Sequence, residues 1–179
     1  PSAAALYGSS AAQGVIMITT KKGAEGKVSV SISNSTQFSS PFKMPEFQNI
    51  YPNRPGEIRS WGEPGTSEYT GFEPKDFFNT GSNVQNNVSL TIGNNKNQSY
   101  VSIGTTNAAG IIPNNKYNSY NFTFRNTTTF LNDKLTLDVG VNYVNQNDCN
   151  LMSQGQYFNP LVPLYLFPRG ESFDAIRTF

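Results

Sequence analysis

The stretch LTLDVGVNY, residues 135–143, decides the fold. Its odd-numbered positions are all aliphatic or aromatic, and its even-numbered positions are Thr, Asp, Gly and Asn. Successive side chains of a β-strand point to opposite faces of the sheet. This period of two therefore predicts a strand with one apolar face and one polar face.

Four further stretches, at residues 28–33, 88–93, 101–104 and 120–125, repeat the same alternation. With no helical pattern after residue 23, they predict an antiparallel all-β domain. We expect one shared apolar face, which contains Val28, Val30, Ile32, Val88, Leu90, Ile92, Val101, Ile103, Phe122, Phe124, Leu137, Val139 and Val141.

The connections between these stretches differ in length. NNKNQ (94–98) and LNDKL (131–135) predict tight hairpin turns, whereas residues 39–86 and the tail after Asn150 read as long and irregular. Short turns at one end and long loops at the other are typical of transmembrane β-barrels.

Charge is almost absent from the strand interiors, where Arg125 and Asp138 both fall on the polar face. If Asn132 and Asp133 form a two-residue turn, Thr127 lies opposite Asp138, and Arg125 is the diagonal neighbour of Asp138. Asn126 and Thr128 fall on the apolar face, where a bulge or a position near lipid headgroups would explain them.

The composition excludes several classes of function. The 179 residues carry a formal net charge of +1, which gives no reason to expect nucleic-acid binding. Charged residues make up 14% and aromatic residues 13%, and no apolar run approaches the roughly 20 residues of a membrane helix. Histidine is absent and Cys149 is the single cysteine, so we predict no catalytic, cofactor-binding or metal-binding residue.

A compact motif, ALYGSSAAQGVIMITTKKG, occupies residues 5–23. It reads as a short helix, a turn ending at Gly14 and a strand over residues 15–21, whose start is apolar on both faces and should be covered on both sides. A phosphate-binding loop is excluded, because Gly14 is followed by Val15 and not by Lys-Ser or Lys-Thr.

This motif resembles the C-terminal end of the plug domain of TonB-dependent outer-membrane transporters, and more narrowly the SusC-like branch. Residues 77–122 resemble the first barrel hairpins of that family. The resemblance implies a plug end at residues 1–23, and the first strands and outer loops of a transmembrane antiparallel β-barrel at 24–179. No signal peptide precedes Pro1, so we expect a piece of a longer chain. The plug-end residues are Tyr7, Gly8, Gly14, Val15, Ile16, Ile18 and Lys21.

The same resemblance implies active import of a large nutrient, an oligosaccharide or a peptide, across the bacterial outer membrane. The implied partners are a SusD-like surface lipoprotein, outer-membrane lipid, and TonB acting through a segment outside this sequence. No cofactor is implied, and no bond is made or broken. The polar face would then line the lumen, with Arg125 and Asp138 as a charge pair there.

The long loop is rich in aromatic residues and prolines, and Trp61, Tyr69 and Phe72 are its candidate contacts to substrate or a partner. The simpler interpretation is that loop aromatics such as Phe47 only fix the loop in place. The sequence RGES, which begins at Arg169, reads as a solvated loop.

Two other interpretations stay open. A soluble or surface-tethered β-sandwich that binds glycans would show the same alternation. Alternatively, the chain could be a passive subunit of a larger outer-membrane assembly. Detergent-dependent solubility would separate the sandwich from the barrel.

Overall fold

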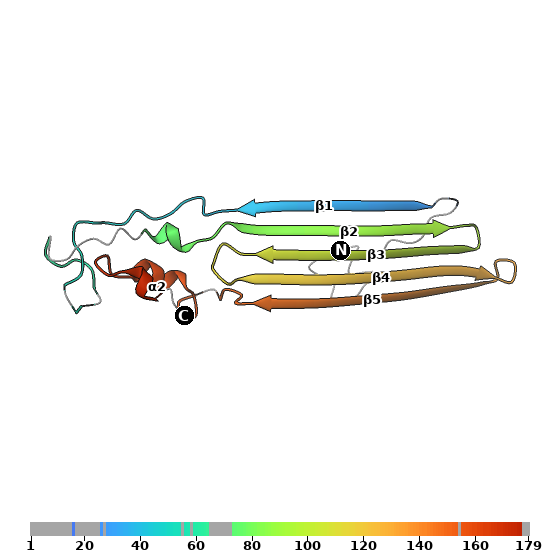
Figure 1. Cartoon of the computed structure of the whole chain (residues 1–179). Helices are drawn as coiled ribbons and strands as arrows, with labels where there is room; N and C mark the ends of the chain where they lie inside the picture. Colours follow the sequence, from blue (N-terminus) through green and yellow to red (C-terminus); the bar gives the residue numbers. More distant parts are fainter. Residues whose placement is uncertain are drawn as a thin grey trace, which may run out of the picture. The chain divides into compact units, whose positions relative to one another are not determined.

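The structure is a computed structural model that describes residues 16, 26, 28–54, 56–57, 59–64, 73–153 and 155–176. Five strands form one antiparallel sheet in the order β1-β2-β3-β4-β5, each strand beside the next in sequence (Figure 1). The predicted all-β fold is therefore confirmed. The strands are β1 (Ser29–Ser39), β2 (Gly81–Gly93), β3 (Asn97–Ala109), β4 (Lys116–Phe130) and β5 (Leu135–Cys149).

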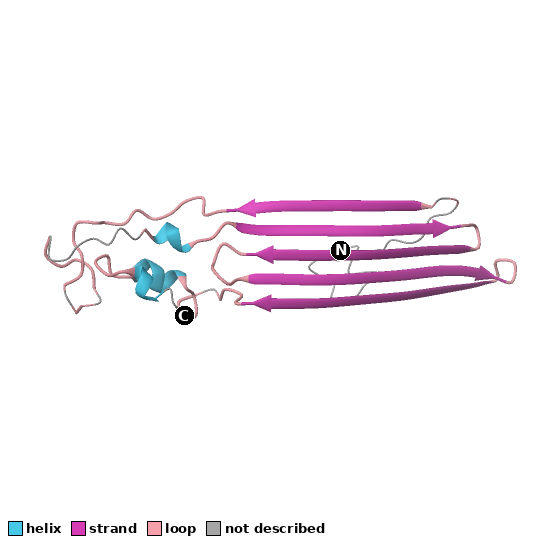
Figure 2. Ribbon diagram, in the orientation of Figure 1, coloured by secondary structure: helices cyan, strands magenta, loops and turns pink. Residues whose placement is uncertain are grey.

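The strands are longer than the alternation predicted, and short helices interrupt the loops. β2 begins at Gly81, so the irregular stretch ends about six residues earlier than expected. The 3-10 helix η2 (Pro74–Phe77) precedes β2, and α2 (Leu161–Leu166) and η3 (Phe173–Ile176) follow β5 (Figure 2). No helix among the described residues is long and apolar enough to cross a membrane.

The chain divides into two compact units, through both of which the strands run. The first unit comprises Pro1–Val30, Ser89–Val101 and Thr123–Val141. The second comprises Ser31–Val88, Ser102–Phe122 and Asn142–Phe179, and it holds the long loop and the tail.

Both predicted hairpin turns, NNKNQ and LNDKL, lie in the first unit. The Asn94 N–H donates to the Asn97 carbonyl (2.8 Å), and the Asn94 side-chain oxygen accepts from the Lys96 and Asn97 N–H groups (2.9 and 2.8 Å). In the other turn the Lys134 N–H donates to the Leu131 carbonyl (3.3 Å), so these two residues pair as predicted. These bonds set the register between the strands on either side.

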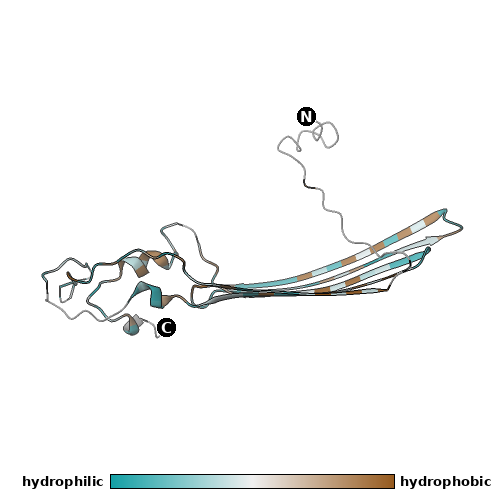
Figure 3. Cartoon of the chain, turned by 90° about the horizontal axis from the view of Figure 1, so that it is seen from above, coloured by the Kyte–Doolittle hydropathy of each residue, from teal (hydrophilic) through white to brown (hydrophobic). Residues whose placement is uncertain are grey.

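In the first unit this register gathers the predicted apolar residues on one face. Leu90, Val101, Phe124 and Val141 form one row across β2 to β5, and hydropathy alternates along the strands in Figure 3. The face is open: Val141 is 51% exposed, and Val30 on β1 is 62% exposed. The described residues form no second sheet that covers it.

Asn126 and Thr128 interrupt this apolar face with a small polar cluster that we call the Asn126 ring. The Asn126 amide donates to the Ser99 hydroxyl (2.8 Å) and to Asn97 Oδ1 (3.2 Å). Asn97 Nδ2 donates to the Thr128 hydroxyl, which donates to Asn126 Oδ1, both at 2.7 Å. No bulge is present, because Ser99 lies opposite Asn126 and Asn97 lies opposite Thr128 in one continuous register. The ring lies near the end of the sheet at which β3 begins and β4 ends.

In the second unit, side-chain amides follow the apolar residues along the strands. Asn34 Nδ2 donates to Asn86 Oδ1 (2.6 Å), and the Asn86 amide donates to the Thr105 hydroxyl (3.4 Å). The Asn107 amide donates to Asn118 Oδ1 (2.9 Å) on the next strand. Hydrogen-bonded polar pairs of this kind stabilise neighbouring strands.

Candidate functional site

The candidate site lies in the second unit, where the long loop meets the tail. Its organising residue is Arg169, which is only 7% exposed. The Arg169 Nε donates to the Gln48 carbonyl and to Asn49 Oδ1 (both 3.2 Å), and its terminal nitrogen bonds Asn49 Oδ1 and pairs with Glu73 (3.4 Å). The guanidinium also lies over the Phe47 ring, 5.5 Å from its centroid. The prediction of a solvated loop at Arg169 is therefore wrong, because this cation is buried and paired.

Asn53 makes a second link between the loop and the tail. It is 2% exposed, and its amide nitrogen donates to the Glu57 carbonyl and to the Glu171 carboxylate, both at 2.9 Å. Its side-chain oxygen accepts from the Gly170 N–H (3.0 Å). A buried amide is stable only when it is hydrogen-bonded, so the bonds to Gly170 and Glu171 fix Asn53 against the tail.

Aromatic rings complete the junction. Phe47 packs against Tyr165 of α2 with ring centroids 5.7 Å apart. Phe173 of η3 meets Phe77 of η2 and Phe167 edge-on, at 6.1 and 5.2 Å. These contacts agree with the interpretation that loop aromatics fix the loop in place.

Trp61 behaves differently, since 71% of it is exposed. Its φ of 75° is in the left-handed region that bulky residues avoid. Two backbone bonds hold it there, from the Trp61 N–H to the Tyr51 carbonyl (3.1 Å) and from the Gly62 N–H to the Pro52 carbonyl (2.7 Å). The indole stacks on Tyr51 at 5.8 Å and 22°.

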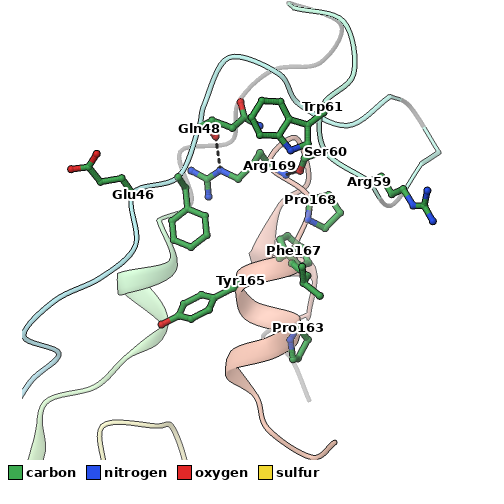
Figure 4. A pocket seen from close by; sticks show the side chains of 12 residues that line it. Glu46, Gln48, Arg59, Ser60, Trp61, Pro163, Tyr165, Phe167, Pro168 and Arg169 are labelled. Carbon is green, nitrogen blue, oxygen red and sulfur yellow. Dashed lines mark hydrogen bonds between the residues drawn. The ribbon is translucent and has the colours of Figure 1, made fainter. Parts of the chain in front are cut away.

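The long loop, α2 and the residues after α2 line an open pocket of about 890 Å³ (Figure 4). Its lining is mainly aromatic, aliphatic and proline side chains from the loop, α2 and the residues after it. Charged side chains at its walls are Glu46, Arg59 and Arg169. The apolar lining comes from Phe47, Trp61, Pro163, Tyr165, Leu166, Phe167 and Pro168.

Of the three predicted loop contacts, the structure places Trp61 at this pocket, while Tyr69 and Phe72 lie outside the described residues. Sequence reasoning missed Tyr165 and Arg169. Arg169 lies 120 residues from its partner Asn49. No local sequence pattern predicts a contact between residues so far apart. Arg169 stood out only as the first residue of RGES, which was interpreted as a solvated loop.

The predicted charge pair is a separate feature of the first unit. Arg125 Nε donates to Asp138 Oδ1 (2.9 Å), and its terminal nitrogen lies 2.6 Å from Asp138 Oδ2. The structure thus brings the two residues together in the two-bond arrangement that suits a guanidinium and a carboxylate. Gly140 is opposite Arg125 in the register. That this face lines a lumen stays a prediction.

The plug-end motif falls almost entirely outside the described residues: Tyr7, Gly8, Gly14, Val15, Ile18 and Lys21 are not among them. Ile16 is described; it lies outside any strand and is 90% exposed. At this residue the expected covered strand is not seen. The predicted strand would be covered by the wall of a closed barrel, whereas the described residues form one sheet of five strands.

Fold and site define a class: an all-β chain whose sequential antiparallel strands expose a shared apolar face, with an aromatic pocket built from its loops. In sequence the chain is similar to the TonB-dependent receptor SusC of Bacteroides thetaiotaomicron, with 32% identity over 151 residues. The match covers 80% of this chain and 15% of the length of that receptor. No family model matches the chain.

Proposed function

We propose that this chain is part of a SusC-like, TonB-dependent transporter that imports a large nutrient across the bacterial outer membrane. The similarity to SusC supports this proposal. The observation that carries it is the shared apolar face, which is exposed and on which no second sheet packs within the described residues. Strands of 11 to 15 residues are long enough for the roughly 9 to 11 residues that a tilted membrane strand needs.

In this proposal, residues 24–179 form the first strands and loops of the barrel wall, and residues 1–23 end the plug inside it. Cargo, either an oligosaccharide or a peptide, binds at the mouth beneath a SusD-like lipoprotein. TonB then supplies the energy that displaces the plug. No covalent step occurs, so the protein is not an enzyme and needs no cofactor.

The β-sandwich alternative requires a second sheet against the apolar face. The strands that the structure describes form a single sheet, and Ile103 on that face is 56% exposed. The passive-subunit alternative does not require a second sheet. It differs from the proposed import function only in that the subunit transports nothing. Uptake measurements therefore separate it from the proposed function.

The test is uptake by cells that carry the full-length parent gene. Labelled glucose oligomers and a casein peptide digest serve as two cargo pools, and a strain without TonB is the control. We expect energy-dependent uptake of one pool that disappears without TonB. Uptake that is unchanged in the strain without TonB, or absent for both pools in all strains, would contradict the proposal.

The plug end has its own test in the same cells. Replacing Ile16 and Ile18 with Asp should loosen the plug without unfolding the barrel, because charged side chains cannot pack inside the wall. Sensitivity to a bulky antibiotic should then rise and uptake should fall. Unchanged uptake together with unchanged exclusion of the antibiotic would show that this stretch does not hold a plug.

A further inference from the structure

Along the apolar face of the second unit, the side-chain chemistry changes from one row of residues to the next. One row contains only aliphatic and aromatic residues, each at least 37% exposed. This apolar row comprises Ile32, Val88, Ile103, Phe122 and Tyr143. In the next row toward the long loop, every side chain carries an amide or a hydroxyl group. This amide row comprises Asn34, Asn86, Thr105, Tyr120 and Asn145.

The hydrogen bonds within the amide row leave two N–H groups without an acceptor among the described residues. Asn34 Nδ2 donates to Asn86 Oδ1 (2.6 Å), and the Asn86 amide donates to the Thr105 hydroxyl (3.4 Å). A carboxamide nitrogen carries two hydrogens, so Asn34 and Asn86 each have one further N–H to donate. The Asn126 ring differs, because Asn126 donates both of its N–H groups to members of the ring. The amide row therefore needs acceptor atoms from outside the described residues.

The two rows need different surroundings in a membrane. The apolar row suits contact with lipid chains, whereas an N–H group without an acceptor is excluded from hydrocarbon. The ester and phosphate oxygens of lipid headgroups are acceptors, and they lie directly outside the hydrocarbon. Tyr143 is in the apolar row and Tyr120 is in the amide row, and tyrosine is typical of the interface between hydrocarbon and headgroups.

Charged side chains appear on this face only beyond the amide row. The row after it is uncharged and comprises Thr36, Val84, Asn107, Asn118 and Asn147. The row after that contains Lys116, which is exposed at the start of β4. A lysine at this height reaches lipid phosphates, because its long and flexible side chain extends the ammonium group toward them.

We propose that the amide row binds the headgroups of membrane lipids, and that the hydrocarbon ends between the apolar row and the amide row. The remaining N–H groups of Asn34 and Asn86 donate to ester or phosphate oxygens, and Lys116 pairs with phosphate. The proposal rests on the proposed import function, which requires a membrane location, and it adds the level at which the headgroups begin.

The test measures the depth of spin labels in the full-length protein, reconstituted in phosphatidylcholine vesicles, whose headgroups offer acceptor oxygens and no donor. Labels are placed one at a time at Ile103, Thr105 and Asn107 on β3, after Cys149 and any cysteine elsewhere in the parent are replaced by Ser. Successive rows of a strand tilted by about 40° differ by about 5 Å in depth. We expect the ratio of oxygen to nickel-chelate accessibility to fall several-fold from Ile103 to Asn107, with Thr105 in between. A label at the native Cys149, which lies opposite Lys116, should give the lowest ratio.

Variants link the boundary to the amides. Asn34→Leu with Asn86→Leu replaces the two amides by aliphatic groups and should move the hydrocarbon boundary outward. The accessibility ratio of the label at Thr105 should then rise to that of the label at Ile103. Asn87→Leu is the matched control, because Asn87 is the neighbour of Asn86 on the opposite face and should leave the ratio unchanged.

A label at Asn107 as protected from nickel as the label at Ile103 would place the amide row inside the hydrocarbon and overturn the proposal. Nickel access at Ile103 equal to that at Asn107 would place both rows outside the hydrocarbon and overturn it as well. Either result with TonB-dependent uptake intact leaves the import function standing. The expected fall in a protein that takes up neither cargo pool would support the amide row and contradict the import function. If the double Leu variant fails to fold, the labels in the protein without it decide the question.

Discussion

At the scale of single residues, polar side chains hold distant parts of this chain together. Arg169 and Asn53 are as buried as the apolar residues Leu164 and Phe173 in the same unit. Their partners across the junction of loop and tail lie 96 to 121 positions away in the sequence. An unpaired buried polar group costs about 1–3 kcal/mol, so the loops are stable only when loop and tail close on each other together.

The pair of Arg125 and Asp138 should behave as one unit. Asp138→Arg places two cations side by side and should lower the melting temperature of the full-length protein in detergent. The double exchange Arg125→Asp with Asp138→Arg should restore most of that loss. High salt should reduce the effect, because both side chains are partly exposed, at 23% and 33%. A double variant no more stable than the single one would contradict the pairing.

The Asn126 ring should be sensitive to the loss of one member. Asn126→Ala removes the hydrogen bonds from Asn126 to the Ser99 and Thr128 hydroxyls, so it should reduce the free energy of unfolding by about 1–2 kcal/mol. Asn147→Ala is the control, because Asn147 is exposed on β5 and makes no side-chain hydrogen bond with a described residue. Equal losses in the two variants, measured by urea titration in detergent, would contradict a cooperative ring.

At the scale of elements, the turn between β4 and β5 contains a removable strain. Leu131, Asn132 and Asp133 all have positive φ, and Leu131 is 72% exposed, so it gains little from packing. Asparagine tolerates this conformation far better than leucine. Leu131→Asn should therefore raise the free energy of unfolding by about 1 kcal/mol. A decrease would show that Leu131 is needed for a contact or for membrane insertion.

The loop segment that presents Trp61 depends on a close backbone approach. A Cβ at Gly62 would lie 2.8 Å from the Pro52 carbonyl oxygen, so Gly62→Ala must push the two segments apart. We expect a local loss of about 1–3 kcal/mol, seen as faster protease cleavage in residues 50–62. Gly140→Ala is a matched control, because its nearest atom would be 3.9 Å away. Unchanged cleavage in Gly62→Ala would contradict the close approach.

Local patterns explain which elements were predictable. Apolar alternation marked all five strands, and the short turn LNDKL was enough to predict that Arg125 meets Asp138. The first residues of β2 were missed because GSNVQNN is largely polar on both faces and offers no contrast. α2 has only six residues, too few for a helical period to appear. The pocket depends on contacts across more than 90 residues, which no local pattern encodes.

At the scale of the whole molecule, the described sheet has two edge strands, β1 and β5, and an uncovered apolar face. In lipid, every backbone group at such an edge needs a partner. The proposed import function therefore requires further strands or other chains beside β1 and β5. The same arrangement in water would be a liability for aggregation.

The central claim is that the apolar face contacts lipid, and spin-label accessibility in the full-length protein tests it most directly. Cys149 is the single cysteine of the chain and is exposed, so it is first replaced by Ser, as is any cysteine elsewhere in the parent. Labels at Leu90 and Val101 are then compared with labels at their neighbours Thr91 and Ser102 in bilayers. We predict that labels at Leu90 and Val101 are accessible to oxygen and protected from a water-soluble nickel chelate. Labels at Thr91 and Ser102 should be less accessible to oxygen than these two. Equal accessibility on both faces, or nickel access at Leu90 and Val101, would contradict a lipid-facing sheet.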